Sequence, residues 1–230
     1  MYTRTSLLVG SANIEKLKAA QVAIFGLGGV GSYVAESLAR SGVGKLILID
    51  ADVVVASNIN RQLPALNSTL GHAKTEVMRQ RLLDINPQCQ IEIITKFYYP
   101  GDFEKFIPQP VDCIVDAIDS LPSKQDLILA AQQRGIKVYS SMGMGNKLDP
   151  MQIKAADISK THTCALAKKL RVNLKKQGLE KGLTVVFSTE KKVINPERKD
   201  NTIASMAFVP ATAGLLLGSL VVRQIIGTTI

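Results

Sequence analysis

The sequence feature that most restricts the fold is a glycine loop within residues 21–50 (QVAIFGLGGVGSYVAESLARSGVGKLILID). Residues 21–25 and 45–49 are short apolar runs, typical of buried parallel strands, and the pattern between them is helical. The loop after the first run has the spacing G-x-G-x-x-G and is formed by Gly26, Gly28, Gly29 and Gly31. Glycine permits positive φ and close approach of a phosphate, and a helix N-terminus attracts anions. The stretch therefore predicts a nucleotide-binding β-α-β unit.

An acidic residue completes this unit. Asp50 directly follows the second apolar run, where a carboxylate is expected to accept hydrogen bonds from ribose hydroxyls. The pattern does not specify the nucleotide, because a nicotinamide or flavin dinucleotide would fit this half of the fold equally well.

The composition is that of an ordinary globular protein. With 230 residues and 46% hydrophobic content, one α/β domain is the default. Three widely separated cysteines, with no C-x-x-C pair, argue against a disulfide framework and a cysteine-only zinc site. No secretion signal is recognised at the N-terminus, so we expect a cytoplasmic protein.

Positive charge is concentrated in one segment. Residues 160–199 hold 11 Lys or Arg against 3 Glu, a net +8, whereas the whole chain carries +9. A cationic patch on a nearly neutral body indicates a docking surface for a polyanion, although a solvated helix face would have the same composition.

The remaining pattern predicts a Rossmann-like, mostly parallel sheet with helices on both faces and a smaller, irregular C-terminal part. We expect a single domain over residues 1–230, with a nucleotide-binding core at 12–150 and a basic docking and dimer-forming part at 151–230. Residues 2–10 are expected to form an arm, and Val77, Leu82 and Ile85 to face inward on a later helix. The other expected strands are 90–95, 112–116, 136–140, 151–156 and 183–188, and the other expected helices are 12–19, 73–85, 100–107, 122–134 and 163–177.

The last apolar stretch, residues 203–226, raises the question of a membrane span. Pro210 interrupts it, and only 12 residues separate Pro210 from Arg223, whereas a spanning helix needs about 20 apolar residues. We therefore expect a core helix. Gly214 and Gly218 would let it pack closely on the sheet or pair with a second helix in a dimer or membrane.

Three polar motifs follow the glycine loop: Asn58-x-Asn60-Arg61-Gln62, Gly71-x-x-Lys74 and Asp116-x-x-Asp119-Ser120. From Arg4 to Ser141 the chain thereby resembles the ubiquitin-activating-like superfamily of ATP-binding enzymes, the ThiF, MoeB and HesA group. Members of that group adenylate a carboxylate, so the resemblance implies a ligase-type enzyme that uses ATP and Mg²⁺.

The resemblance also implies roles for single residues. Arg61 and Lys74 would neutralise phosphate, Asp119 would contact magnesium, and Asn58 and Gln62 would hydrogen-bond the nucleotide. Asp52 is expected to support the loop rather than to bind ATP. The superfamily places an arginine near the position of Arg4 that reaches into the neighbouring subunit's ATP site, which implies a homodimer.

The C-terminal half resembles the tRNA threonylcarbamoyladenosine dehydratases, through Ser140-Ser141-Met142-Gly143-Met144-Gly145-Asn146-Lys147-Leu148-Asp149-Pro150, Asp157-Ile158-x-Lys160-Thr161, Leu166-Ala167-Lys168, Val186-Phe187-Ser188 and Phe208-Val209-Pro210. This family is thought to activate the threonyl carboxylate of a modified adenosine beside the anticodon. A carbamoyl nitrogen or oxygen then closes a ring, with net loss of water. The reaction implies tRNA, not DNA, as the nucleic-acid partner, and the phosphate-docking candidates are Lys168, Lys169, Arg171, Lys175 and Lys176.

Several alternatives remain open at this point. An adenylyltransferase for a ubiquitin-like sulfur-carrier protein would share the ATP motifs, but such enzymes usually carry two C-x-x-C zinc pairs, and some use a catalytic cysteine. A sulfur-transfer or carrier protein is accordingly a candidate partner. A non-catalytic nucleotide-binding module and a dehydrogenase are further alternatives. Cys164 is the best candidate for covalent chemistry, with an incidental thiol as the simpler interpretation, and K⁺ or Na⁺ is a candidate ligand of the 140–146 loop.

Overall fold

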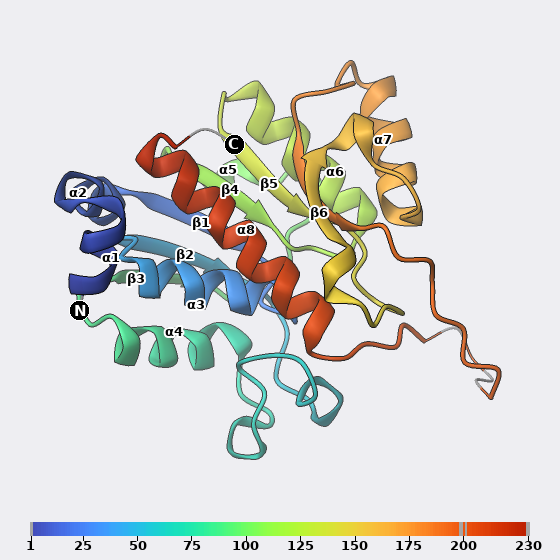
Figure 1. Ribbon diagram of the computed structural model, residues 1–230, viewed down its shortest axis with the longest axis horizontal. Coiled ribbons are helices and arrows are strands. Elements are labelled where there is room, and N and C mark those ends of the chain that lie inside the picture. The colour runs from blue at the N-terminus through green and yellow to red at the C-terminus, as the bar shows by residue number, and fades with distance from the viewer. Residues whose placement is uncertain (1, 198–199, 201, 229–230) are drawn as a thin grey trace.

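The computed structural model describes residues 2–197, 200 and 202–228. These residues form a seven-stranded sheet in the order β3-β2-β1-β4-β5-β7-β6, in which only β6 runs antiparallel to its neighbour. Figure 1 shows the strands side by side with helices packed against them. The strands are β1 (Gln21–Phe25), β2 (Lys45–Ile49), β3 (Gln90–Ile94), β4 (Cys113–Asp116), β5 (Lys137–Ser141), β6 (Ile153–Asp157) and β7 (Thr184–Ser188).

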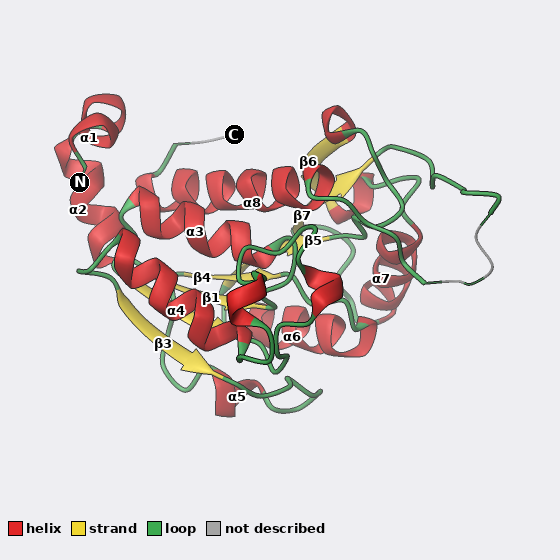
Figure 2. Ribbon diagram, turned by 90° about the horizontal axis from the view of Figure 1, so that it is seen from below, coloured by secondary structure: helices red, strands yellow, loops and turns green. Residues whose placement is uncertain are grey.

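Helices cover both faces of this sheet, as the alternating pattern predicted. One apolar core joins the sheet to α2, α3, α4 and α8, and a second core joins its other face to α5, α6 and α7. In Figure 2, α3 and α8 lie on one side of the strands and α5 and α6 on the other. The helices are α1 (Thr3–Val9), α2 (Ser11–Ala19), α3 (Gly31–Ser41), α4 (Lys74–Ile85), α5 (Phe103–Phe106), α6 (Leu121–Gln133), α7 (Ala165–Lys176) and α8 (Phe208–Ile226). The prediction of an α/β, mostly parallel fold is confirmed.

Helix α8 packs closely on α3 through glycines. A Cβ at Gly214 would lie 2.5 Å from the Val30 carbonyl oxygen, and one at Gly218 would lie 2.1 Å from Ser37 Oγ. By length and composition α8 could cross a membrane, and 44% of its most apolar window is buried within the protein. Both glycines thus serve a contact inside this chain, which confirms the expected core helix.

Two local expectations were wrong. Residues 2–10 do not form an extended arm: residues 3–9 are helix α1, which packs on α2, and Tyr2 Oη donates a hydrogen bond to Asn86 Oδ1 (3.1 Å). In α4, Met78 is fully buried whereas Val77 is only partly buried, because the inward stripe runs through Lys74, Met78 and Leu82.

Candidate functional site

A large cleft of about 670 Å³ opens at the carboxyl ends of β1, β2 and β4. The chain runs from β1 to β2 on one side, and β4 flanks β1 on the other, so the cleft lies at the point where the strand order reverses. Such switch points are where open α/β sheets bind ligands. We call it the strand-end cleft; its lining includes Gly26, Gly28, Gly29, Asp50, Asp52, Asn58, Arg61, Gln62, Lys74, Lys96, Phe97, Asp119, Ser120, Ser141, Gly143, Gly145, Leu166, Ile203, Ser205 and Pro210.

The glycine loop forms one wall of the cleft, and its glycines have different reasons to lack a side chain. Gly26 has a φ of +91°, and a Cβ there would lie 2.7 Å from the Ala117 carbonyl oxygen. A Cβ at Gly31, the first residue of α3, would lie 1.8 Å from the Gly26 carbonyl oxygen. At Gly28 the nearest atom would be Gln62 Nε2 at 3.8 Å, so this position opens onto the cleft. Gly26 and Gly31 are thus required by packing, and Gly28 leaves space for a ligand.

Asp50 is fixed at the end of β2 by two backbone N–H groups. Its Oδ2 accepts from Leu27 (2.6 Å) and its Oδ1 from Asp52 (2.8 Å). Burial raises the pKa of Asp50 above its ordinary value of 3.8, although the charge of Lys74 and both backbone hydrogen bonds act in the opposite direction. A carboxylate held in this way can accept hydrogen bonds from ligand hydroxyls.

Lys74 brings positive charge to the same wall. Its side chain is only 5% exposed, and its Nζ lies 2.7 Å from Asp52 Oδ2 and 4.0 Å from Asp50 Oδ1. Its backbone N–H also donates to the Asp52 carbonyl (3.0 Å). Asp52 therefore holds the lysine at the start of α4, in line with the supporting role expected from the sequence.

The segment from Asn58 to Gln62 forms the rim above the glycine loop. Asn58 Oδ1 accepts from the Val55 N–H (3.3 Å), and Arg61 Nη1 donates to Ser57 O (2.7 Å) and Asn60 Oδ1 (2.8 Å). Gln62 is 9% exposed, and its Oε1 is the one buried side-chain nitrogen or oxygen that has no partner among the described residues. A buried polar atom without a partner is costly, so Gln62 Oε1 is a candidate acceptor for a hydrogen bond from a ligand.

Asp119 lies on the loop after β4, on the side of the cleft formed by the ends of β4 and β5. The residue is exposed and lines the cleft, whereas Asp116, three residues earlier, is fully buried. Within the described residues no group of three or more His, Cys, Asp or Glu could enclose a metal ion. Asp119 offers one carboxylate to a hard cation that binds together with the oxygens of a ligand.

The other residues expected to function lie outside the cleft. Arg4 is exposed on α1, which with α2 precedes the N-terminal end of β1 (Figure 1). On α7, Arg171 is half-buried and donates to the Thr161 carbonyl (2.9 Å), and Lys175 pairs with Glu180 (3.2 Å). Three lysines of α7 are exposed as well as Lys175: Lys168, Lys169 and Lys176.

Cys164 is buried at the start of α7. It is 7% exposed, and a Cβ at Gly143 would lie 3.6 Å from its Sγ. This packing favours the simpler interpretation of an incidental thiol.

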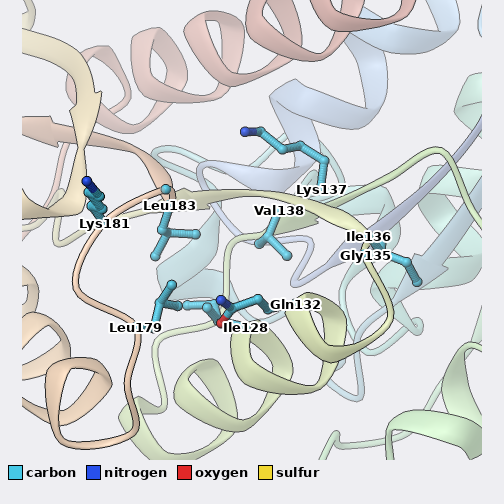
Figure 3. A pocket seen from close by; sticks show the side chains of 10 residues that line it. Ile128, Gln132, Gly135, Ile136, Lys137, Val138, Leu179, Lys181 and Leu183 are labelled. Carbon is cyan, nitrogen blue, oxygen red and sulfur yellow. The ribbon is translucent and has the colours of Figure 1, made fainter.

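A second, smaller cavity lies elsewhere and contains none of the expected ATP-site residues. It measures about 220 Å³, and in Figure 3 its lining comes from the end of α6, the start of β5 and the segment before β7. Lys137 begins β5 and Leu183 precedes β7, so this cavity lies at the opposite end of these strands from the strand-end cleft.

One buried residue beneath the cleft, Lys124 on α6, was not expected from the sequence. It is 0% exposed and forms an ion pair with Asp116, with 2.7 Å between Nζ and Oδ2. Its spacing gave a signal, because Lys124 falls on the same helical face as the buried Leu127, Ile128 and Ala131.

Comparison with known proteins gives consistent matches over most of the chain. The model of the ThiF family matches residues 2–229. The tRNA threonylcarbamoyladenosine dehydratase of Bacillus subtilis (strain 168) is 42% identical over 239 residues, covering 98% of this chain and 94% of that protein. The enzyme of the same name from Escherichia coli (strain K12) is 37% identical over 209 residues, covering 88% of this chain and 77% of that protein. The crystal structure of E. coli tRNA N6-threonylcarbamoyladenosine dehydratase in complex with ATP is similar to this fold with a TM-score of 0.92 at 35% identity, covering 98% of this chain and 93% of that one.

Proposed function

The chain belongs to the ThiF family, and we infer from its cleft that it is an ATP-dependent tRNA threonylcarbamoyladenosine dehydratase. This inference rests mainly on one observation: a single cleft at the strand ends is lined by Asp50, Arg61, Lys74 and Asp119. Similarity over nearly the whole chain to dehydratases, one of them solved with ATP bound, supports the same function.

An oxygen of the threonyl carboxylate attacks a phosphorus of ATP and forms an acyl phosphate bond. If the α-phosphorus is attacked, pyrophosphate leaves and AMP is released later; if the γ-phosphorus is attacked, ADP leaves and phosphate is released later. The carbamoyl nitrogen or oxygen then attacks the activated carbonyl, a carbamoyl N–H releases its proton, and the phosphate or AMP that departs keeps one of the two original carboxylate oxygens. The nucleoside has thereby lost one water.

The residues of the cleft have distinct proposed roles in this reaction. The glycine loop and the N-terminus of α3 would face the phosphates, and Asp50 would accept from the ribose hydroxyls. Arg61 and Lys74 would offset charge on the phosphates, which is the main way such transfers are accelerated. Asn58 and Gln62 would hydrogen-bond the nucleotide, and the unpaired Gln62 Oε1 supports that assignment.

Magnesium fits this site as a companion of ATP. Asp119 supplies one exposed carboxylate, and Mg²⁺ is usually held by one or two carboxylates together with substrate phosphates. When bound, the ion offsets phosphate charge. We also propose a monovalent cation, K⁺ or Na⁺, at the 140–146 loop, where backbone carbonyls are suitable neutral oxygen donors.

The rest of the chain would serve tRNA docking and assembly. We propose that residues 151–230 form the docking and dimer-forming part of a single domain, with Lys168, Lys169, Arg171, Lys175 and Lys176 against tRNA phosphates. Arg4, which does not line the cleft of its own chain, would reach the cleft of a second copy in a cytoplasmic homodimer.

The adenylyltransferase alternative is not favoured, because the dehydratases match more of this chain, at higher identity, than the sulfur-carrier adenylyltransferase does. A sulfur-transfer or carrier protein stays a proposed partner only. The test compares ATP consumption by purified protein with threonylcarbamoyl-modified tRNA, with unmodified tRNA and without RNA, followed by mass analysis of the nucleosides. Loss of one water from the modified nucleoside, only when ATP is present, supports the dehydratase. ATP–pyrophosphate exchange with unchanged tRNA would contradict it and favour a carrier protein as substrate.

A further inference from the structure

A lysine with no exposed surface lies under the strand-end cleft. Lys124, in the second turn of α6, and Asp116, the last residue of β4, both have fully buried side chains. Charged groups are rarely buried completely, because removal from water is costly unless hydrogen bonds replace the lost hydration. The contacts of this pair therefore indicate why it is retained.

The pair joins the ends of two strands. Lys124 Nζ donates to Asp116 Oδ2 (2.7 Å), Ser140 Oγ (3.2 Å) and the Ser141 carbonyl oxygen (3.0 Å). An ammonium has three hydrogens, so these contacts within the described residues use all of them. Lys124 consequently has no donor left for a substrate, and any effect on the reaction must pass through its neighbours.

Those neighbours carry two adjacent walls of the cleft. Asp116 Oδ1 accepts from the Ile118 N–H (3.1 Å), which fixes the turn that presents Asp119. On β5, Ser141 is the residue from which the 141–145 loop enters the cleft. Both loops line the cleft, and Lys124 is hydrogen-bonded to the base of each.

We propose that Lys124 is a positioning residue for carboxylate activation, which sets the spacing between the Asp119 turn and the 141–145 loop. The proposal rests on the dehydratase function. The threonyl carboxylate must approach ATP between these walls, and misplacement by about 1 Å can cost a factor of about 100 in rate. Most of the contacts proposed for ATP lie on other elements, namely the glycine loop, Asp50 and the Asn58–Gln62 rim, and Asp119 would reach ATP only through Mg²⁺. Loss of Lys124 should therefore lower kcat and leave the Kd for ATP nearly unchanged.

The test needs a variant that keeps the fold. Lys124→Met alone leaves Asp116 buried and unpaired, so this variant is expected to unfold at lower temperature. In the double variant Lys124→Met with Asp116→Asn, the side-chain amide at position 116 can still accept a hydrogen bond from the Ile118 N–H and donate one to Ser140 Oγ. The hydrogen bond from Lys124 to the Ser141 carbonyl is lost. A matched control is Glu36→Gln with Arg81→Met, which removes an ion pair between α3 and α4 (2.5 Å) whose residues do not line the cleft.

The midpoint of thermal unfolding, the Kd for ATP and kcat on modified tRNA are measured for parent, single, double and control variants. We expect the double variant to regain most of the midpoint lost in the single variant, to bind ATP within twofold of the parent and to have a kcat at least tenfold lower. The control should keep the parental kcat. A double variant with the midpoint and kcat of the parent overturns the proposal, and so does one in which ATP binding falls in parallel with kcat. Failure of the parent itself to convert modified tRNA would instead refute the dehydratase function.

Discussion

The Lys74 ammonium lies 2.7 Å from the Asp52 carboxylate, and it lies 4.0 Å from that of Asp50. Asp52 is about half exposed, with 54% of its side-chain surface accessible, whereas Asp50 is mostly buried. A lysine between these acids is held in place before any ligand arrives, and its charge can be shared with a phosphate without a large movement.

This arrangement predicts unequal effects for the two partners. Lys74→Ala should lower kcat/KM by about 100- to 1000-fold, because it removes the charge that we propose stabilises the negative charge developing on the phosphoryl group. Asp52→Asn should lower kcat/KM less than about tenfold, since Asp50 and the start of α4 still hold the lysine. Steady-state kinetics with modified tRNA measure both. Equal losses would mean that Asp52 takes part in the reaction itself.

The raised pKa of Asp50 predicts an acid-dependent loss of ATP affinity. Burial is the main cause of the raised pKa. Between pH 3.8, the ordinary pKa, and the raised pKa of the folded state, Asp50 binds more protons in the folded protein than in the unfolded chain. The contribution of Asp50 to folding stability therefore decreases as pH rises through this window. ATP affinity should change in the opposite direction, because only the carboxylate accepts two ribose hydroxyls.

The matching measurement is the Kd for ATP against pH for the parent and for Asp50→Asn. The ratio of the two Kd values cancels the titration of ATP itself. This ratio should approach one as pH falls, starting above pH 3.8. Parallel curves would show that Asp50 does not contact the nucleotide.

Arg4 provides a test of action between subunits. Arg4→Ala and Asp119→Ala should each be inactive alone. After subunit exchange, about half of the dimers in an equal mixture contain one copy of each variant. Each mixed dimer has one complete cleft, in which Asp119 comes from one subunit and Arg4 from the other. About a quarter of the parental activity should therefore return. Activity of an equal mixture is compared with that of each variant alone. No recovery would exclude action of Arg4 in trans.

The basic face of α7 predicts a change in salt dependence. Lys168→Gln with Lys169→Gln should weaken tRNA binding and reduce the slope of log kcat/KM against log salt concentration by about two. The control Lys16→Gln with Lys18→Gln, on α2, should keep the parental slope. An unchanged slope in the α7 variant would place the tRNA elsewhere.

Much of the fold was predictable because its information is local. Parallel strands buried on both faces are continuous apolar runs, such as residues 21–25 and 45–49, and glycine spacing marks the turn between strand and helix. Asp50, Arg61 and Lys74 come after the second of these strands and Asp119 after β4, and all four line the cleft, whereas their roles toward ATP stay predictions.

Other features depend on contacts between distant segments. Helix α1 has no acidic residue in its first turn and no side-chain cap, and its position depends on α2 and on contacts of Tyr2. The cleft wall formed by Ile203, Ser205 and Pro210 comes from a stretch without a local signal for this role. Lys124 had a signal in its helical spacing, but a lysine at such a position is usually read as an exposed charge.

Activation of the threonyl carboxylate by ATP is tested by following the oxygen that is lost. Modified tRNA with oxygen-18 in both carboxylate oxygens is allowed to react once in unlabelled water, and the phosphorus products and the nucleoside are analysed by mass. One labelled oxygen is expected in AMP or in inorganic phosphate, and the other in the cyclised nucleoside. A cyclised nucleoside with the label absent from every phosphorus product would contradict activation by ATP.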